Sequence, residues 1–219
     1  GKILILKSGK IYLREYFFSD KIEEKEILVM DNFVEMERFS FSKNLTHLAG
    51  LKDDNLKLYE IIDKNLKEIY SIDLKDKILK SFKLGNNLLA YVVNDFLIIY
   101  DFKNKKEILN TKIDVSNFYS IDFFEEASFF AIGGWFDSVY VFDLNNIEGK
   151  YSLKLSGITN SVKFVKDYPA LLISKGDKVL LWRFKEDNLL SYSEEGMNFV
   201  SSDLTPFGIV SVEKRENKV

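Results

Sequence analysis

The sequence predicts an all-β fold built from a repeated unit of about 41 residues. Three features support this: a recurring aspartate, a recurring aromatic residue and an apolar alternation between them. The aspartates follow one another at steps of 41, 42 and 40 residues, at Asp54, Asp95, Asp137 and Asp177. Each is followed five positions later by an aromatic residue: Tyr59, Tyr100, Phe142 and Trp182. Four copies in phase indicate an internal repeat.

Apolar residues occupy alternate positions between each aspartate and its aromatic residue. Two residues after the aspartates stand Leu56, Leu97, Val139 and Val179, and four after them stand Leu58, Ile99, Val141 and Leu181. A period of two is typical of a strand with one buried face. No stretch of twelve or more residues shows helical spacing without competing alternation, so we expect almost no helix.

The chain begins partway through a repeat. We expect strands at residues 2–7 and 10–18, joined by a turn at Ser8-Gly9, where Gly9 takes the position of the later aspartates. The charged stretch from Ser19 to Lys25 predicts a solvated turn, and residues 26–30 predict an outer strand.

Four whole repeats follow the partial repeat at residues 2–31. We place them at about 32–76, 77–115, 116–157 and 158–196. Each offers four short strands, in the first of them at residues 33–42, 45–51, 55–62 and 66–72. A trailing part at residues 197–219 predicts strands at 199–204 and 208–213. We expect one domain over residues 1–219, with an incomplete repeat at each end.

The segments LAGLKDDNLKLYE, YVVNDFLIIYD, AIGGWFDSVYVFD and LISKGDKVLLWR each predict two strands joined by a tight turn that contains the aspartate. An acid follows the aromatic residue in three copies, and Arg183 replaces it in the fourth. The chain thereby resembles the WD-repeat family, most closely from Ala131 to Asp143. The resemblance implies a β-propeller of four-stranded blades, with about five blades or as a fragment of a six- or seven-bladed ring. The Gly-His pairs of that family are absent here.

Composition excludes several classes of protein. The 31 basic and 34 acidic residues are interspersed and give a net charge of −3, so we expect no nucleic-acid partner. No apolar run approaches the roughly 20 residues of a membrane helix, and we expect no membrane partner. The apolar run at the start of the sequence is too short for a secretion signal, so we expect the protein to lie in the cytoplasm.

No constellation of catalytic or ligating residues stands out. Cysteine is absent, and the single histidine, His47, lies on an expected strand, where packing or hydrogen bonding is the usual role. We therefore predict a protein that is not an enzyme and has no metal and no cofactor. A hydrolase or lyase with carboxylates drawn from different blades is an open alternative, because such a pair needs only proximity in space.

One turn differs from the others. Trp135 and Phe136 fill a position where the other repeats carry Lys, Asp, Asn or Gly, and exposed aromatic residues are enriched at binding hot spots. Either this turn binds a partner, or the Trp135 side chain folds back over the central channel of the expected propeller or over the edge of a blade. The aspartates either close their own turns or face a partner.

We predict a scaffold that binds another protein or peptide on one propeller face, as a candidate subunit of a multiprotein complex. The partner-binding residues would be Trp135, Phe136, Asp137, Asp54, Asp95 and Asp177. An open ring completed by a partner strand is the alternative form of binding.

Overall fold

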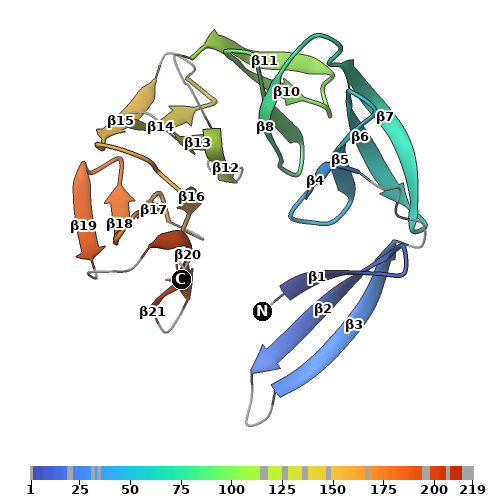
Figure 1. Cartoon of the computed structure of the whole chain (residues 1–219), viewed down its shortest axis with the longest axis horizontal. Coiled ribbons are helices and arrows are strands. Elements are labelled where there is room, and N and C mark those ends of the chain that lie inside the picture. Colours follow the sequence, from blue (N-terminus) through green and yellow to red (C-terminus); the bar gives the residue numbers. More distant parts are fainter. Residues whose placement is uncertain are drawn as a thin grey trace, which may run out of the picture. The chain divides into compact units, whose positions relative to one another are not determined.

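The chain is all-β, as predicted. The computed structural model describes residues 2–18, 22–30, 33, 36–113, 118–124, 128–134, 138–146, 149–165, 168–193, 198–205 and 208–213. Over these ranges it forms strands β1 to β21, joined by turns and loops, and no helix (Figure 1). The strands divide into separate antiparallel sheets, four of which have four strands.

Two compact units make up the chain. The first comprises Gly1–Lys77 with Leu84–Leu88, and the second comprises Ile78–Lys83 with Leu89–Val219. The first unit holds a three-stranded sheet of β1 (Lys2–Lys7), β2 (Lys10–Phe18) and β3 (Ile22–Met30). Its second sheet consists of β4 (Arg38–Phe41), β5 (His47–Lys52), β6 (Asn55–Ile62) and β7 (Asn65–Asp73).

The remaining sheets repeat this meander. The next consists of β8 (Leu79–Leu84), β9 (Leu88–Val93), β10 (Phe96–Asp101) and β11 (Lys106–Lys112). Then come β12 (Phe118–Phe124), β13 (Phe129–Gly134), β14 (Ser138–Asp143) and β15 (Lys150–Lys154). The last four-stranded sheet consists of β16 (Ser161–Phe164), β17 (Leu171–Lys175), β18 (Lys178–Arg183) and β19 (Asn188–Ser193). Finally β20 (Phe199–Thr205) and β21 (Gly208–Glu213) pair as a two-stranded sheet.

The predicted alternation is confirmed at the third strand of each four-stranded sheet. The residues two positions after the aspartates are at most 1% exposed, at Leu56, Leu97, Val139 and Val179. The aromatic residues five positions after the aspartates point to the opposite face, and Tyr59, Phe142 and Trp182 are also buried there. The third strands therefore bury side chains on both of their faces, although Tyr100 and Leu181 are only half-buried.

Two predicted boundaries were wrong. The turn expected from Ser19 to Lys25 is shorter, because β3 already begins at Ile22 and Phe18 pairs with Ile22. Charged residues are compatible with a strand when their side chains reach solvent. Arg14 and Glu26 are an example, because both side chains are partly exposed and form an ion pair across this sheet, with 2.8 Å between Arg14 Nη2 and Glu26 Oε2. The strand expected at residues 33–42 is only Arg38–Phe41 in the structure.

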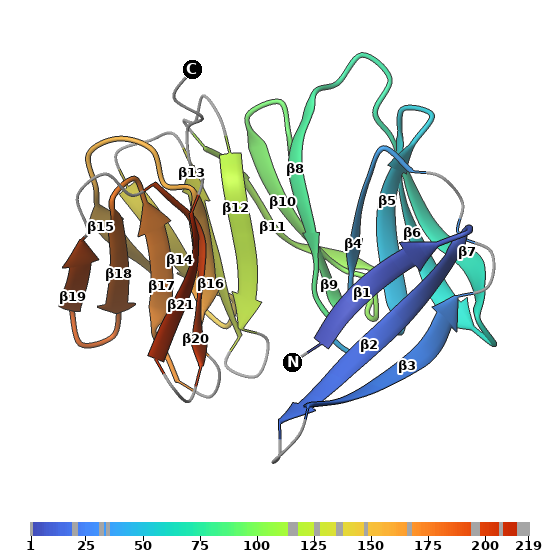
Figure 2. The same cartoon turned by 60° about the horizontal axis from the view of Figure 1, so that its bottom comes forward.

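In the second unit, the β12–β15 sheet lies beside the β16–β19 sheet (Figure 2), and the two share a core of buried side chains. Phe124, Phe129 and Val141 of one sheet pack with residues of the next, including Trp182 and Phe184. Burial of one such side chain stabilises the fold by about 1.5–3 kcal/mol, so the apolar contact between these sheets contributes substantially to the stability of this unit.

Polar side chains on the first strands link sheets that follow one another. The Ser120 hydroxyl accepts a hydrogen bond from the Val162 N–H at 3.0 Å, and the Asp122 carboxylate accepts one from the Phe164 N–H at 2.9 Å. In the first unit the Ser40 hydroxyl accepts one from the Leu84 N–H at 3.1 Å. These bonds satisfy backbone donors on the free edge of a first strand, where no further strand pairs.

Candidate functional site

The recurring aspartates lie in the turns between the second and third strands. Asp53 and Asp54 join β5 to β6 with φ of 49° and 56°, the positive angles of a type I′ hairpin turn. Asn94 and Asp95 join β9 to β10, and Gly176 and Asp177 join β17 to β18. The side chains of Asp54, Asp95 and Asp177 are all exposed. Each of these three sheets therefore presents a carboxylate at the corresponding turn.

The backbone of this turn has a repeated structural role. The Asp54 carbonyl accepts a hydrogen bond from the Leu74 N–H at 2.9 Å, and the Asp95 carbonyl accepts one from the Ile113 N–H at 2.8 Å. Gly9 makes the equivalent bond with the Phe33 N–H at 2.7 Å. In each case the carbonyl of the turn residue holds the segment that follows the outer strand of the same sheet. This hydrogen bond thereby orients the turn.

The Asp95 carboxylate is bound by a lysine. Lys80 Nζ lies 2.9 Å from Asp95 Oδ1. This hydrogen bond and the charge of Lys80, with a smaller contribution from Lys112, lower the pKa of Asp95. The carboxylate is therefore held ionised, in an ion pair that remains open to solvent.

Other acids close turns with their side chains, at the opposite end of the hairpins. The Asp101 carboxylate accepts a hydrogen bond from the Asn104 N–H, and the Asp143 carboxylate accepts one from the Asn145 N–H, both at 2.9 Å. Both are the acids that directly follow the aromatic residue of the repeat. Carboxylate capping of a turn is thus seen at these acids.

Three of the predicted site residues, Trp135, Phe136 and Asp137, lie outside the described residues. Their flanks are described: β13 ends at Gly134 and β14 begins at Ser138, so three residues separate these strands. The equivalent turns at residues 53–54, 94–95 and 176–177 have two residues. The partner-binding role of the six predicted residues stays a prediction.

The predicted residues are distributed over both units. Asp54 belongs to the first unit, and Asp95 and Asp177 belong to the second. What the structure establishes for them is a common position in each sheet and a common exposure to solvent.

His47 lies on β5, where the sequence places it. Its Nδ1 is 2.8 Å from the Thr46 hydroxyl, and its side chain is partly buried. Burial lowers the pKa of His47, while the Glu60 carboxylate on the neighbouring strand raises it by a smaller amount. A hydrogen-bonded, largely neutral histidine in a sheet is a structural group.

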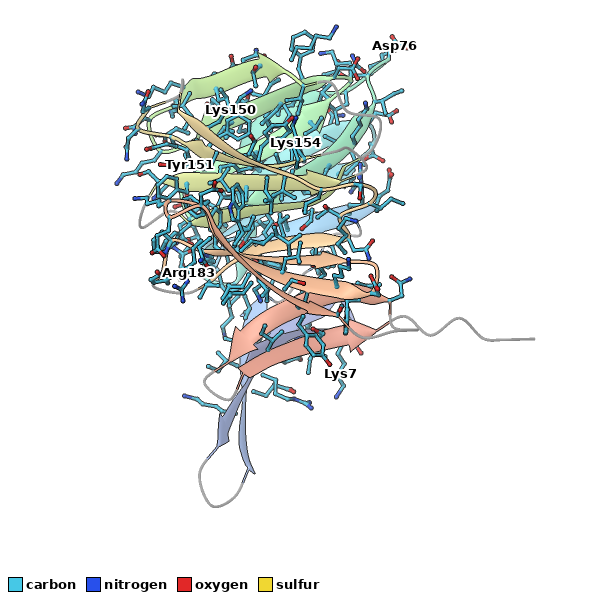
Figure 3. All side chains as sticks on the ribbon, turned by 90° about the vertical axis from the view of Figure 1, so that its left-hand side faces the viewer. Lys7, Asp76, Lys150, Tyr151, Lys154 and Arg183 are labelled. Atoms are coloured by element: carbon cyan, nitrogen blue, oxygen red, sulfur yellow. The ribbon has the colours of Figure 1, made fainter. Side chains whose placement is uncertain are left out.

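A cluster of polar and aromatic side chains connects two loops of the β16–β19 sheet, at the end opposite the Asp177 turn. The Tyr168 hydroxyl donates a hydrogen bond to Glu186 at 2.8 Å, which raises the pKa of Tyr168. The Arg183 guanidinium lies over the Tyr168 ring at 5.7 Å (Arg183 is labelled in Figure 3). These side chains contact one another, which identifies the cluster as a local structural element.

Sequence reasoning missed an exposed apolar surface in the same sheet. Leu190 and Tyr192 of β19 are 52% and 53% exposed, although the Tyr192 ring also lies 6.3 Å from the Phe199 ring. Leu181 on the neighbouring strand is half-buried and packs against the buried cluster that contains Phe199. The signal in the sequence is weak, because the alternation of Leu190, Ser191, Tyr192 and Ser193 resembles that of any half-buried strand.

No metal site and no membrane helix appear in the part of the chain that the structure describes. There, no three His, Cys, Asp or Glu side chains group so that they could hold an ion. Nor does any helix in that part have the length and apolarity to cross a bilayer.

Comparison with known proteins identifies the fold. No protein-family model matches the chain, and no curated protein sequence matches it. Among solved structures, Saccharomyces cerevisiae Sqt1, a WD40 protein, is similar with a TM-score of 0.64 at 13% sequence identity. The match covers 88% of this chain and 58% of the Sqt1 chain.

This likeness, together with the four-stranded antiparallel sheets, shows a WD40-like β-propeller fold of four-stranded blades. The predicted fold class is therefore confirmed. In all, 1177 solved chains match, so the likeness identifies an architecture that many proteins share and does not assign a function.

Proposed function

We propose that this protein is a non-catalytic scaffold that binds another protein or a peptide on one face of its propeller. The observation that carries the proposal is the exposed carboxylate at the same turn of several sheets, at Asp54, Asp95 and Asp177. Because the strands behind each turn carry buried apolar side chains, these acids stand on a well-packed support. The WD40-like fold supports a binding role, since such propellers present loops at the ends of their blades.

The turn predicted at residues 135–137 would supply the apolar anchor of this face. Trp135 and Phe136 are large aromatic residues, which dominate the energy of many protein interfaces. Ionised aspartates around such an anchor select a partner segment that carries Lys or Arg beside an apolar residue.

The proposal is tested with a partner captured from the native host by the purified chain. Binding of that partner is then measured by calorimetry for the wild type and for Trp135→Ala and Phe136→Ala. We expect each substitution to weaken binding by at least about tenfold, the usual loss at an interface hot spot.

A matched control comes from the opposite end of a hairpin. Ile62 is an exposed apolar residue next to the turn at Asp63 and Lys64, so Ile62→Ala should leave the affinity unchanged. An affinity that Trp135→Ala and Phe136→Ala leave unchanged would retire the anchor, and hydrolysis of a captured partner would favour the enzyme alternative.

A further inference from the structure

Gly50 departs from the pattern of the second strands. It pairs with the residue three positions after the aspartate of its turn, as Ile132 and Ile173 do in later sheets. Tyr91, four residues before Asp95, takes this position in the β8–β11 sheet. These three large residues are at most 6% exposed. Among the described four-stranded sheets, only β4–β7 therefore has no side chain at this buried position.

Met36 supplies the missing side chain from outside the strand. A Cβ atom on Gly50 would lie 3.1 Å from Met36 Cγ and 3.2 Å from Met36 Cε, and it would collide with the Met36 sulfur. Met36 is 8% exposed and packs in a buried cluster with Met30 of β3, Leu48 of β5 and Tyr59 of β6. A residue of the connection between β3 and β4 thus completes the core between the first two sheets.

Hydrogen bonds hold this connection on both sides of Met36. The Phe33 N–H donates to the Gly9 carbonyl of the first sheet at 2.7 Å. The Glu37 N–H donates to the Leu51 carbonyl of the second sheet at 3.0 Å. Because Glu37 directly follows Met36, displacement of the Met36 side chain would pull on the second of these bonds.

The sulfur of Met36 is the atom whose polarity a reaction can change. The chain has no cysteine and three methionines, Met30, Met36 and Met197. Peroxides convert a methionine thioether into a polar sulfoxide. Met30 is 0% exposed and Met36 is 8% exposed, so a small oxidant reaches Met36 more readily. The cluster around Met36 is mainly apolar, and a polar oxygen is costly there.

We propose that Met36 is a reversible oxidation site that controls how tightly the connection between β3 and β4 is held. The sulfur attacks one oxygen of hydrogen peroxide, so that an S–O bond forms and the O–O bond breaks. The proton of the transferred hydroxyl passes to the departing hydroxide, which leaves as water. Sulfur loses two electrons, and the peroxide gains them.

The added oxygen has no room beside Gly50, so the oxidised side chain leaves the core and the Glu37 hydrogen bond opens. Methionine sulfoxide reductases reverse the oxidation, and the thioether then returns to its place. This device goes beyond the proposed binding role and does not depend on it.

The test treats the whole chain with increasing hydrogen peroxide and follows each methionine by mass spectrometry of its peptides. We expect Met36 to oxidise at least about fivefold faster than Met30. The melting temperature should fall by at least about 3 °C, and hydrogen exchange should accelerate at the Glu37 amide. Methionine sulfoxide reductases of both stereospecificities should restore the two values.

Matched variants assign the effect to one sulfur. Met36→Leu keeps the apolar volume without the thioether, so peroxide should leave its melting temperature unchanged. Met30→Leu is the control, because it retains Met36 and should show the same shift as the wild type. Met36→Gln places a polar group beside Gly50 and should lower the melting temperature without any peroxide.

Three outcomes would overturn the proposal. The first is an equal peroxide-induced shift in Met36→Leu, which would place the effect at another residue. The second is complete oxidation of Met36 with unchanged exchange at the Glu37 amide. The third is a loss of stability that the reductases do not reverse, because irreversible damage is not a switch.

Discussion

The sheets β12–β15 and β16–β19 share one sequence pattern but bury it to different extents. Their third strands carry the same apolar pair, Val139 and Val141 in one and Val179 and Leu181 in the other. Val139 and Val141 are fully buried, whereas Leu181 is half-buried next to an exposed Leu190. Val139 and Val141 lie in the large core cluster with Trp182, whereas Val179 and Leu181 pack in a smaller cluster with Phe199 of β20.

This comparison teaches that burial in the second unit is a property of sheet pairs. A strand of this repeat is stable when the next sheet covers it, and the same residues become a surface when it does not. Repeat proteins in general derive their stability from contacts between neighbouring units. The contribution of a residue to the free energy of unfolding should therefore depend on how completely the neighbouring sheet covers it.

The largest effect is expected where the cover is complete. Trp182→Ala removes a side chain that is 1% exposed and lies in the core between the two sheets. We expect the free energy of unfolding to fall by about 3–5 kcal/mol, the usual cost of truncating a buried Trp or Phe. Urea unfolding followed by circular dichroism measures it.

The control for this position is Trp182→Phe. The indole N–H of Trp182 is buried and has no hydrogen-bond partner among the described residues. Phenylalanine removes that donor and keeps most of the apolar volume, so most of the stability should be retained. An equal loss of stability from both substitutions would contradict the view that Trp182 stabilises the fold through its apolar contacts.

A smaller effect is expected at Gly133, where β13 lies close to the residues of the next sheet. A Cβ atom on Gly133 would lie 2.7 Å from Val162 Cγ1 and 2.8 Å from Thr159 Cγ2, so one sheet would have to move from the other. Gly133→Ala should lower the free energy of unfolding by about 1–3 kcal/mol through overpacking. Combining it with Val162→Ala, which opens space, should cost less than the two single changes added together.

Substitution of a leucine by alanine in the outer strand of each sheet tests whether cover by a neighbouring sheet determines the contribution of a residue to stability. Leu153→Ala truncates a residue that packs against the core cluster, and Leu190→Ala truncates one that is 52% exposed. We expect a loss of about 1–2 kcal/mol at Leu153 and of at most about 0.5 kcal/mol at Leu190. Thermal melting of the two variants in parallel measures the difference. Equal losses would mean that the cover of an outer strand does not determine its contribution.

The parts of the fold that the sequence predicted are those set by short-range pattern. The third strands and the Asp turns follow from alternation and tight-turn residues within six positions, and the structure has them at Asp54, Asp95 and Asp177. The strand from Ile22 was missed because its acids and lysine are also typical of a solvated turn.

The candidate sites were less predictable, because exposure depends on residues far along the chain. The burial of Leu190 and Tyr192 depends on which residues of other strands pack against β19, such as Phe199, and no pattern within β19 records this. The bonds from Ser120 and Asp122 to the next sheet join residues 42 positions apart, so the local sequence shows only a polar residue on a strand. The exposed carboxylates at the turns were predictable, because a two-residue turn between buried strands always reaches solvent.

The smallest effect is expected at an exposed ion pair that no neighbouring sheet covers. Lys80 lowers the pKa of Asp95, so the folded state binds a proton at this carboxylate less readily than the unfolded state does. The stabilisation from this pair is complete above the unfolded pKa of the aspartate and is lost as the pH falls through its lower pKa in the folded state. Asp95→Asn should therefore lower the melting temperature slightly at pH 7, and the difference from wild type should vanish at acidic pH. High salt should also reduce the difference, because the pair is open to solvent. Asp177→Asn, in the equivalent turn of the β16–β19 sheet, is the comparison, and a loss at Asp95 that persists at low pH would show that the side chain acts through packing.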